Sequence, residues 1–290
     1  MRKIKRMNYN KLKLSLSLVL VLFITGASAQ SFENANESKK ATLNVMYFEN
    51  EPYAYNSEKG DLVGIEIDIM NSFVSWIKAE KEIELKLNFV PFSKFSSFYA
   101  QIQTAPMNTI GLGSVTITEK RLKEVKFSAP YLKNVSVLIT DGTVPTARNE
   151  EGLVNEILGL LPVTIKGSIH QTHLNHLYTD RNMDKRKYVY VEEVTDIPNK
   201  IKESAKYYGY VDVISFWKYL KFNTDHYIKM HSIANKKGEE FGFIMPQTTD
   251  WDNVVNEFFE SGFGFTSTKE YHTILEKHLS FEIISKVELD

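Results

Sequence analysis

The most informative segment of the chain reads TITEKRLKEVKFSAPY, from Thr116 to Tyr131. Thr118 is suited to cap a helix N-terminus, because its hydroxyl can accept a hydrogen bond from a free N–H of the first turn. Glu119 follows in that turn, where the helix dipole favours an acid. Pro130 disfavours a helical backbone at Ala129, so a helix cannot continue to the end of the segment. The pattern predicts a short helix that presents Arg121 in its first turn and is followed by a turn.

The residues before this segment alternate between strand-like and helical patterns. Apolar and β-branched runs predict strands, and apolar residues at helical spacing predict amphipathic helices. The expected strands are 42–48, 85–90 and 110–115, and the expected helices are 63–76 and one around 95–102. A βαβαβ series of this kind is typical of an α/β fold.

The residues after the segment repeat the alternation. The expected strands are 135–140, 163–166, 188–191, 211–214 and 241–245. One helix is expected to begin near residue 169, and three more are expected at 197–207, 251–260 and 268–278. At roughly 150 residues per domain, the 290 residues suggest about two domains, each large enough to have its own core.

The composition is that of an ordered soluble protein. Hydrophobic residues make up 43% of the chain, charged residues 24% and aromatic residues 12%, and there is no cysteine. These values exclude a disordered chain, a collagen-like repeat and a disulfide scaffold.

The first 29 residues predict a cleaved secretory signal peptide. Six basic residues and no acid precede an apolar run from about Leu14 to Ala27, and Ala27 and Ala29 supply the small residues of a cleavage site. A membrane anchor is the weaker alternative, because the run is shorter than the ~20 residues that span a bilayer. Residues 30–40 are polar and lack periodicity, so they predict a short disordered leader.

Charge and cysteine content indicate the compartment. Cleavage would leave 261 residues with 29 basic and 36 acidic side chains, a net charge of −7. This charge disfavours nucleic acid and anionic lipid as partners. Because no cysteine is present for lipid attachment, the exported product would be unanchored, and we expect a monomer free in a periplasm.

Four segments resemble the extracellular solute-binding proteins of polar amino-acid ABC transporters, family 3. The segment from Thr116 to Tyr131 is similar to the family pattern T-x-T-x-x-R…V-D-F-S-x-P-Y and is the most specific of the four. The others are 51–68, similar to P-F-x-F…G-x-hydrophobic-G-[FY]-[DE]-[VI]-D, 163–168, similar to V-x-x-G-[ST], and 209–213, similar to G-x-[VA]-D-A. Together they extend over nearly the whole mature chain.

The resemblance implies the two-lobed type II periplasmic binding fold. Each α/β lobe would hold a mixed β-sheet flanked by helices, and the ligand would lie in the cleft between the lobes. Lobe 1 is expected at 41–132 plus 238–290 and lobe 2 at 136–236. The two hinge crossovers would fall near 131–136 and 235–239.

Arg121 is the first candidate for ligand binding, because a planar guanidinium can hold a carboxylate through two hydrogen bonds. A solvated surface arginine is the alternative. The resemblance implies that the matching arginine binds the ligand's α-carboxylate, with Thr116 and Ser114 beside it as backbone and hydroxyl donors. Gly167 and Ser168 open a helix whose free N–H groups could face the same anion, or they form an ordinary tight turn.

Further candidates surround this point. Tyr53 and Phe92 match family positions whose rings cover the ligand's side chain, although core packing is the alternative for Phe92. His170 follows in the first turn after Ser168 and is expected to contact the ligand.

One departure from the family concerns the ligand's other end. Amino-acid binders of this family have an aspartate that pairs with the ammonium group, and this chain has Phe216 and Trp217 there. A buried ammonium without a partner is unfavourable. We therefore expect a ligand whose carboxylate meets Arg121 and whose other end, beside Trp217, is neutral or aromatic. The exception would be that another acid, such as Glu49 or Glu51, pairs with the ammonium group of an amino acid.

No metal, cofactor or catalytic residue is predicted. His170, His173 and His176 are spaced so that the third ring lies well off the face of the first, and no cysteine or clear acidic ligand accompanies them. Asp68 and Asp212 match structural positions of the family.

The leading hypothesis is a periplasmic solute-binding protein that is not an enzyme and that presents a small carboxylate to an inner-membrane ABC permease. One alternative is a dehydratase-like periplasmic enzyme on the same scaffold, with Glu49, Glu51 or His170 as acid or base. Another is a sensor or partner-binding protein that has lost amino-acid binding.

Overall fold

The computed structural model describes residues 30–180 and 187–289. The predicted signal peptide, residues 1–29, lies outside the described residues. Within the described ranges, no helix combines the length and the apolar character needed to cross a membrane.

The structure is built on one ten-stranded sheet. Its main path runs β4-β1-β5-β12-β7-β10-β8-β9, with β6 paired to β12 and β11 paired to β7. The strands of the path are β4 (Glu84–Phe92), β1 (Lys40–Phe48), β5 (Thr109–Thr116), β12 (Lys236–Met245), β7 (Leu132–Asp141), β10 (Tyr207–Asp212), β8 (Leu161–Ile165) and β9 (Val189–Val191). The short strands are β6 (Lys126–Phe127), β11 (Ile228–Met230) and the separate pair β2 (Tyr55–Asn56) and β3 (Leu62–Val63).

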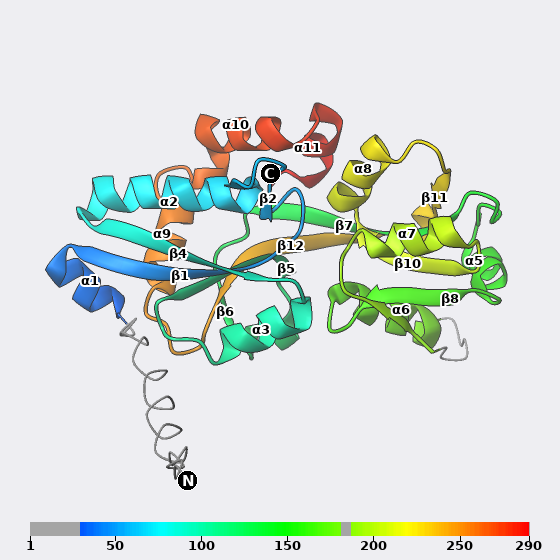
Figure 1. The fold of residues 1–290 in the computed structure, drawn as a ribbon, viewed down its shortest axis with the longest axis horizontal. Coiled ribbons are helices and arrows are strands. Elements are labelled where there is room, and N and C mark those ends of the chain that lie inside the picture. The colour runs from blue at the N-terminus through cyan, green and yellow to red at the C-terminus, as the bar shows by residue number, and fades with distance from the viewer. Residues whose placement is uncertain (1–29, 181–186, 290) are drawn as a thin grey trace, which may run out of the picture.

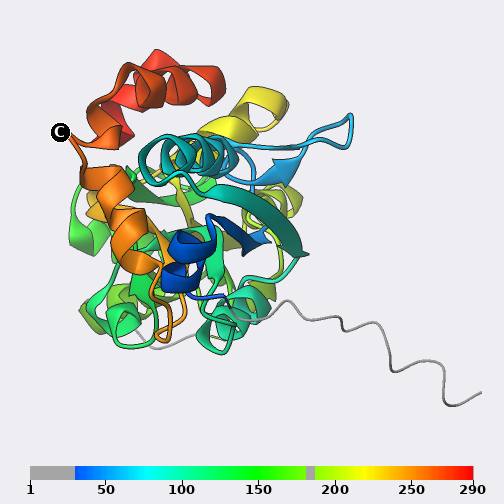
Figure 2. The same ribbon diagram turned by 90° about the vertical axis from the view of Figure 1, so that its left-hand side faces the viewer.

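Two lobes share this sheet. The first lobe is formed by β1, β4, β5 and β6 and the second by β8 to β11, and the long strands β7 and β12 run from one lobe into the other (Figure 1). The first-lobe helices are α1 (Phe32–Ser38), α2 (Ile65–Lys81), α3 (Phe95–Gln103), α4 (Glu119–Leu122), α9 (Asp252–Glu260), α10 (Lys269–His278) and α11 (Phe281–Val287). The second-lobe helices are α5 (Glu150–Ile157), α6 (Ile169–Asp180), α7 (Asp196–Glu203) and α8 (Val213–Phe222). Figures 1 and 2 show α2 and α10 on one side of the first-lobe sheet and α3 on the other.

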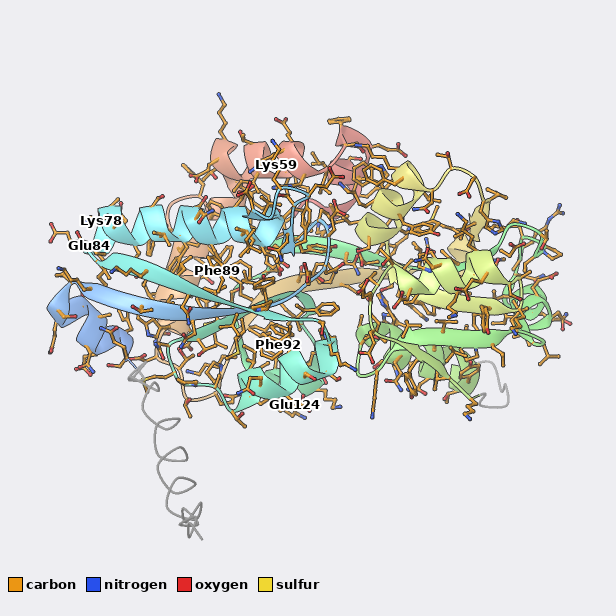
Figure 3. All side chains as sticks on the ribbon, viewed as in Figure 1. Lys59, Lys78, Glu84, Phe89, Phe92 and Glu124 are labelled. Atoms are coloured by element: carbon orange, nitrogen blue, oxygen red, sulfur yellow. The ribbon has the colours of Figure 1, made fainter. Side chains whose placement is uncertain are left out.

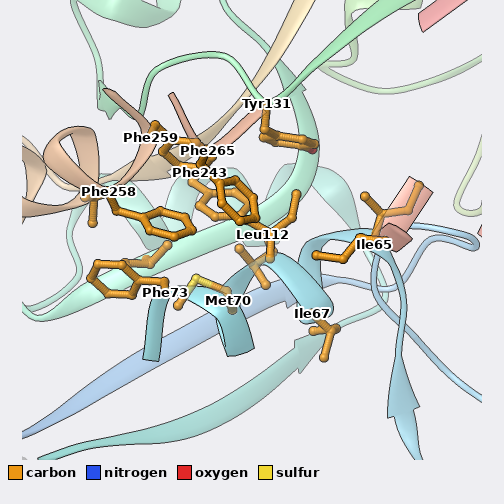
Figure 4. Packing of buried hydrophobic residues seen from close by; sticks show 14 of the residues in the cluster. Ile65, Ile67, Met70, Phe73, Leu112, Tyr131, Phe243, Phe258, Phe259 and Phe265 are labelled. Carbon is orange, nitrogen blue, oxygen red and sulfur yellow. The ribbon is translucent and has the colours of Figure 1, made fainter. Parts of the chain in front are cut away.

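The core of the first lobe forms where α2 packs on the sheet. Its buried residues Ile69, Met70 and Phe73 recur at helical spacing, as an amphipathic helix requires. Figure 4 shows Phe73 close to Phe258 of α9, and their ring centroids are 5.5 Å apart. Burying a side chain of this size contributes about 1.5–3 kcal/mol. The second lobe has hydrophobic clusters of its own, so each lobe holds a separate core.

The two strands shared by the lobes lie side by side. In the register of β7 and β12, Ser136 faces Lys236 and Asn134 faces Glu239. The predicted crossovers, 131–136 and 235–239, fall in this antiparallel pair. The residue limits of the two lobes stay a prediction.

The chain differs from the prediction at its first described residues. Residues 30–40 were expected to form a disordered leader, and they contain α1 and the start of β1. Ser31 caps α1 by accepting a hydrogen bond from Asn34 N at 3.1 Å. The Phe32 ring lies edge-on to Trp251 with centroids 5.4 Å apart, and Ala35 is fully buried. Trp251 lies more than 200 positions away in the chain, so the local sequence pattern of residues 30–40 could not reveal this contact.

Two expected elements end earlier than predicted. The helix expected over 197–207 ends at Glu203, and Tyr207 begins β10. The strand expected over 211–214 ends at Asp212, whose carboxylate accepts a hydrogen bond from Ser215 N at 2.8 Å and caps α8. A short apolar run does not distinguish a strand from a helix start, so the cap decides the boundary.

Candidate functional site

A cavity lies between the lobes beside the shared strands. It contains about 450 Å³ of space not filled by atoms, with open solvent at its mouth included. First-lobe residues that line it are Phe48, Asn50, Phe95, Gly113, Ser114, Thr116, Arg121 and Phe241, and the others are Asn134, Ile165, Ser168, Ile169, His170, Val194 and Asp212. Of the nine predicted site residues, the cavity brings together Arg121, Thr116, Ser114, Ser168 and His170.

Arg121 is held in the cavity wall by the short helix α4. Thr118 caps this helix as predicted, accepting a hydrogen bond from Arg121 N at 3.2 Å. The guanidinium Nη1 donates to Thr116 O at 3.0 Å, and Nη2 donates to Gly167 O of the second lobe at 3.4 Å. The Arg121 side chain therefore connects the two lobes.

The charge of Arg121 is buried, and the acids that act on it electrostatically, Glu124 and Glu239, form no ion pair with it. The residue is 8% exposed, and its guanidinium carbon lies 5.5 Å from the ring centroids of both Phe95 and Tyr99. Within the described ranges, no carboxylate forms an ion pair with it. Burial accordingly lowers the pKa of Arg121 from its ordinary value. A buried cation that contacts only rings and carbonyl groups provides a site for an anion.

The end of β5 does not offer the ligand the backbone donor that was expected at Ser114. Ser114 N and Gly113 N donate to Glu66 Oε1 at 3.0 and 3.1 Å, and Tyr131 Oη donates to the same oxygen at 2.5 Å. The backbone donor expected from Ser114 is therefore occupied by Glu66. Burial raises the pKa of Glu66 to about 7.

The hydroxyl of Thr116 is available to a ligand. Thr116 is 3% exposed, and its Oγ1 has no hydrogen-bond partner although the residue lines the cavity. A buried hydroxyl without a partner is destabilising, so this atom favours a polar group in the cavity.

The turn before α6 lies on the opposite wall. Ser168 lines the cavity, but its Oγ donates to Ile165 O at 2.8 Å and accepts from Gln171 N at 3.2 Å. Gly167 is not among the lining residues; its N–H donates to Gln171 Oε1 at 2.8 Å and its carbonyl accepts from Arg121. In this turn the Gly167 carbonyl contacts Arg121, and the Ser168 hydroxyl caps α6.

The ring from this region that lines the cavity is Phe95 and not Phe92. Phe92 packs edge-on against Phe98 with centroids 6.1 Å apart and is not among the lining residues; Figure 3 shows it beside α3. The core alternative that the sequence left open for Phe92 is the one that the structure adopts.

Tyr53 and Trp217 also lie outside the cavity lining. Tyr53 is fully buried, and its Oη donates to Asp212 Oδ1 at 2.9 Å. Trp217 is half-buried and packs against the first-lobe core. Neither ring forms part of the wall that the resemblance implied. Trp217 faces the first-lobe core because α8 begins directly after Asp212.

The acid that lines the cavity is Asp212. Burial raises its pKa, and its Oδ1 already accepts hydrogen bonds from Tyr53 and Ser215. The two acids that the sequence offered as substitutes lie elsewhere. Glu49 accepts from Asn56 Nδ2 at 3.1 Å, and Glu51 forms an ion pair with Lys218 at 2.8 Å.

A buried polar network supports the cavity at the shared strands. Asn134 Nδ2 donates to Glu239 Oε2 at 2.7 Å, and Ser136 Oγ donates to the same oxygen at 2.9 Å. His173 Nε2 of α6 hydrogen-bonds Glu239 Oε1. Burial alone would raise the pKa of Glu239, but these partners hold it below its ordinary value.

His170 reaches the cavity one turn before His173. It is 8% exposed, and its Nε2 has no hydrogen-bond partner. Burial lowers the pKa of His170 to about 3. Within residues 30–180 and 187–289, no three potential metal ligands cluster together.

Sequence reasoning missed several residues of the cavity. Phe95, Ile165, Asn134 and Val194 come from separate helices, strands and loops, and no motif joins them. Asn134 carried one signal, since it stands within a predicted crossover where both lobes meet.

Comparisons with known proteins agree with this architecture. The family model of bacterial extracellular solute-binding proteins, family 3, matches residues 43–280. The lysine/arginine/ornithine-binding periplasmic protein of Escherichia coli (strain K12) is 26% identical over 133 residues, which are 46% of this chain and 46% of that protein. The chain thus matches about half the length of this curated relative.

Two solved structures show the same fold. An ancestral arginine-binding protein bound to arginine superimposes with a TM-score of 0.68 at 20% identity, covering 82% of this chain and 98% of its own. An ancestral amino acid-binding protein, described as a precursor of cyclohexadienyl dehydratase, has a TM-score of 0.62 at 17% identity, covering 82% and 96%. The predicted two-lobed type II periplasmic binding fold is confirmed. Because the family model extends over most of the chain, the protein belongs to the bacterial extracellular solute-binding proteins, family 3.

Proposed function

We propose that this protein captures a small carboxylate-bearing ligand, an amino acid or a related organic acid, in the interlobe cavity for delivery to an ABC permease. The observation that supports this proposal is the buried Arg121, which lines the cavity and forms no ion pair with a described carboxylate. Family membership and relatives named for binding amino acids support the same class of ligand.

The energetics favour an anion beside Arg121. A buried charge is strongly unfavourable unless an opposite charge and hydrogen bonds compensate it. The guanidinium already contacts both lobes, through Thr116 O and Gly167 O. A carboxylate bound there could also accept a hydrogen bond from Thr116 Oγ1. Ligand binding would then stabilise the form in which both lobes meet.

Other contacts already join the lobes around the cavity. Tyr53 donates to Asp212, and Lys218 forms an ion pair with Glu51. We propose that binding and release occur by opening of these contacts around the paired strands β7 and β12. A monomer exported to the periplasm by cleavage of residues 1–29 fits this function.

Calorimetry on the purified protein with a panel of amino and organic acids tests the proposal. Arg121→Ala should weaken binding of the best acid at least tenfold, since loss of a charged partner costs about 2–5 kcal/mol. Arg121→Lys should recover only part of the affinity, because an ammonium lacks the planar fork. Lys120→Ala is the matched control, because that side chain is exposed on the same helix.

The proposal fails if Arg121→Ala binds the best acid as the parent does while remaining folded by circular dichroism. A binding change in Lys120→Ala equal to that in Arg121→Ala would assign the effect to surface charge.

An enzyme on this scaffold is the second candidate, favoured by an acid and an imidazole, Asp212 and His170, that line the same cavity. The low pKa of His170 makes it a weak base, and Asp212 is held by Tyr53 and Ser215. We therefore expect binding without turnover. Chromatography of each bound acid after long incubation checks this, and any new product would favour the enzyme.

A further inference from the structure

We infer that the cavity contains a second polar subsite, formed by Asn134 and His170 beside the shared strands, that binds a hydroxyl group of the ligand. The inference rests on the proposed function, because it takes Arg121 as the carboxylate site. It adds the second group that the ligand must carry.

Asn134 contributes an acceptor in a fixed position. The residue lines the cavity and is 1% exposed. Its Nδ2 donates to Glu239 Oε2 at 2.7 Å, and Glu239 is held in turn by Ser136 and His173. The amide cannot turn over without breaking this network. Asn134 Oδ1 is buried and has no protein partner, so the cavity is the source from which a donor can reach it.

His170 contributes a neutral ring on the adjacent helix. It precedes His173 by three residues on α6, and residues at that spacing lie on one helix face. Because His173 bonds Glu239, this face of α6 lies against the strand pair that carries Asn134. His170 Nε2 is buried without a partner, and the low pKa keeps the ring uncharged. A neutral imidazole can donate one hydrogen bond from this nitrogen.

A hydroxyl group satisfies both atoms. It can donate to Asn134 Oδ1 and accept from His170 when the imidazole carries its proton on Nε2. Apolar side chains form much of the remaining wall: Phe48, Phe95, Ile165, Ile169, Val194 and Phe241. The ligand class is therefore a small carboxylate with an apolar body and a hydroxyl group.

Matched acids that differ by one hydroxyl test the subsite. The probes are benzoate, phenylacetate and 3-phenylpropanoate, each with its 3-hydroxy and 4-hydroxy ring derivatives, titrated into the full mature protein by calorimetry. At least one hydroxy acid should bind fivefold or more tightly than its parent acid, which is about 1 kcal/mol at 1.4 kcal/mol per tenfold. Equal affinity within every series overturns the inference.

Variants assign the preference to the two residues. Asn134→Ala and His170→Leu should each reduce the hydroxyl preference to less than twofold. His176→Leu is the matched control, because that side chain is exposed on the same helix and does not line the cavity, and it should keep the preference. If one cavity variant does not fold, the other decides. A preference that survives in a folded cavity variant overturns the inference.

The two proposals can fail separately. Arg121→Ala should weaken a hydroxy acid and its parent acid by the same factor. If Arg121→Ala abolishes binding but the parent protein shows no hydroxyl preference, the proposed function stands and the subsite is wrong. If no acid of these series binds but an amino acid or another organic acid of the panel does, the proposed function stands and the subsite is wrong; if no acid of either set binds, both fail.

Discussion

Replacing Glu66 by glutamine should stabilise the protein above pH 7 and remove part of its pH dependence. Glu66 is fully buried in the first turn of α2, and burial raises its pKa from 4.5 to about 7. Between these pH values the folded state keeps a proton that the unfolded state has lost. Stability therefore falls as pH rises through this window and is constant above it.

The size of the stability change follows from the pKa shift of Glu66. One pH unit corresponds to about 1.4 kcal/mol, so a window of this width removes about 3 kcal/mol of the free energy of unfolding. Glutamine keeps an oxygen for Gly113 N, Ser114 N and Tyr131 Oη, and its amino group replaces Oε2, which has no partner. We expect Glu66→Gln to match the parent within about 1 kcal/mol at pH 4.5 and to exceed it by up to about 3 kcal/mol at pH 8.

Urea unfolding followed by tryptophan fluorescence at pH 4.5, 6 and 8 measures both quantities. Glu80→Gln is the matched control, since that residue is exposed on the same helix, and it should change stability equally at all three pH values. A Glu66→Gln variant that is less stable than the parent at pH 8 and keeps the parent's pH dependence would refute the reasoning. It would mean that Glu66 is ionised in the fold and that its three hydrogen bonds outweigh the burial of its charge.

Three further predictions concern selectivity and packing. Glutamine, arginine, histidine and glutamate should not bind with submicromolar affinity by calorimetry, because Asp212, the acid among the described lining residues, already accepts hydrogen bonds from Tyr53 and Ser215; submicromolar binding of one of them would contradict this. Phe32→Ala should lower the free energy of unfolding by about 2 kcal/mol and expose the amides of α1 to hydrogen exchange, because its ring packs on Trp251; unchanged exchange would show that α1 does not depend on this contact. Gly64→Ala should lower the melting temperature strongly, because its φ is +136° and a Cβ would lie 2.1 Å from Tyr53 O; an unchanged melting temperature would contradict the backbone geometry.

Local patterns predicted elements wherever the cause of the element is local. Thr118 caps α4 because the capping oxygen and the N–H that it accepts from lie three residues apart. The apolar spacing of α2 and the buried run of β5 are visible in the same way. Helix α1 was missed because its stability depends on Trp251 and Asp250, which are distant in the chain.

The amino-acid sequence alone predicted the α/β class from residue types at short spacings, and its resemblance to the family implied the two-lobed fold and Arg121 as a site candidate. Only the tertiary structure decided which rings and polar atoms meet Arg121. Phe95 rather than Phe92 forms the wall, Trp217 packs on the first-lobe core, and Asn134 contributes an unpartnered oxygen. The physical reason is that a cavity between lobes is made of side chains from many strands and helices. Their orientations depend on strand register, helix starts and burial, and these are fixed only when both lobes pack together.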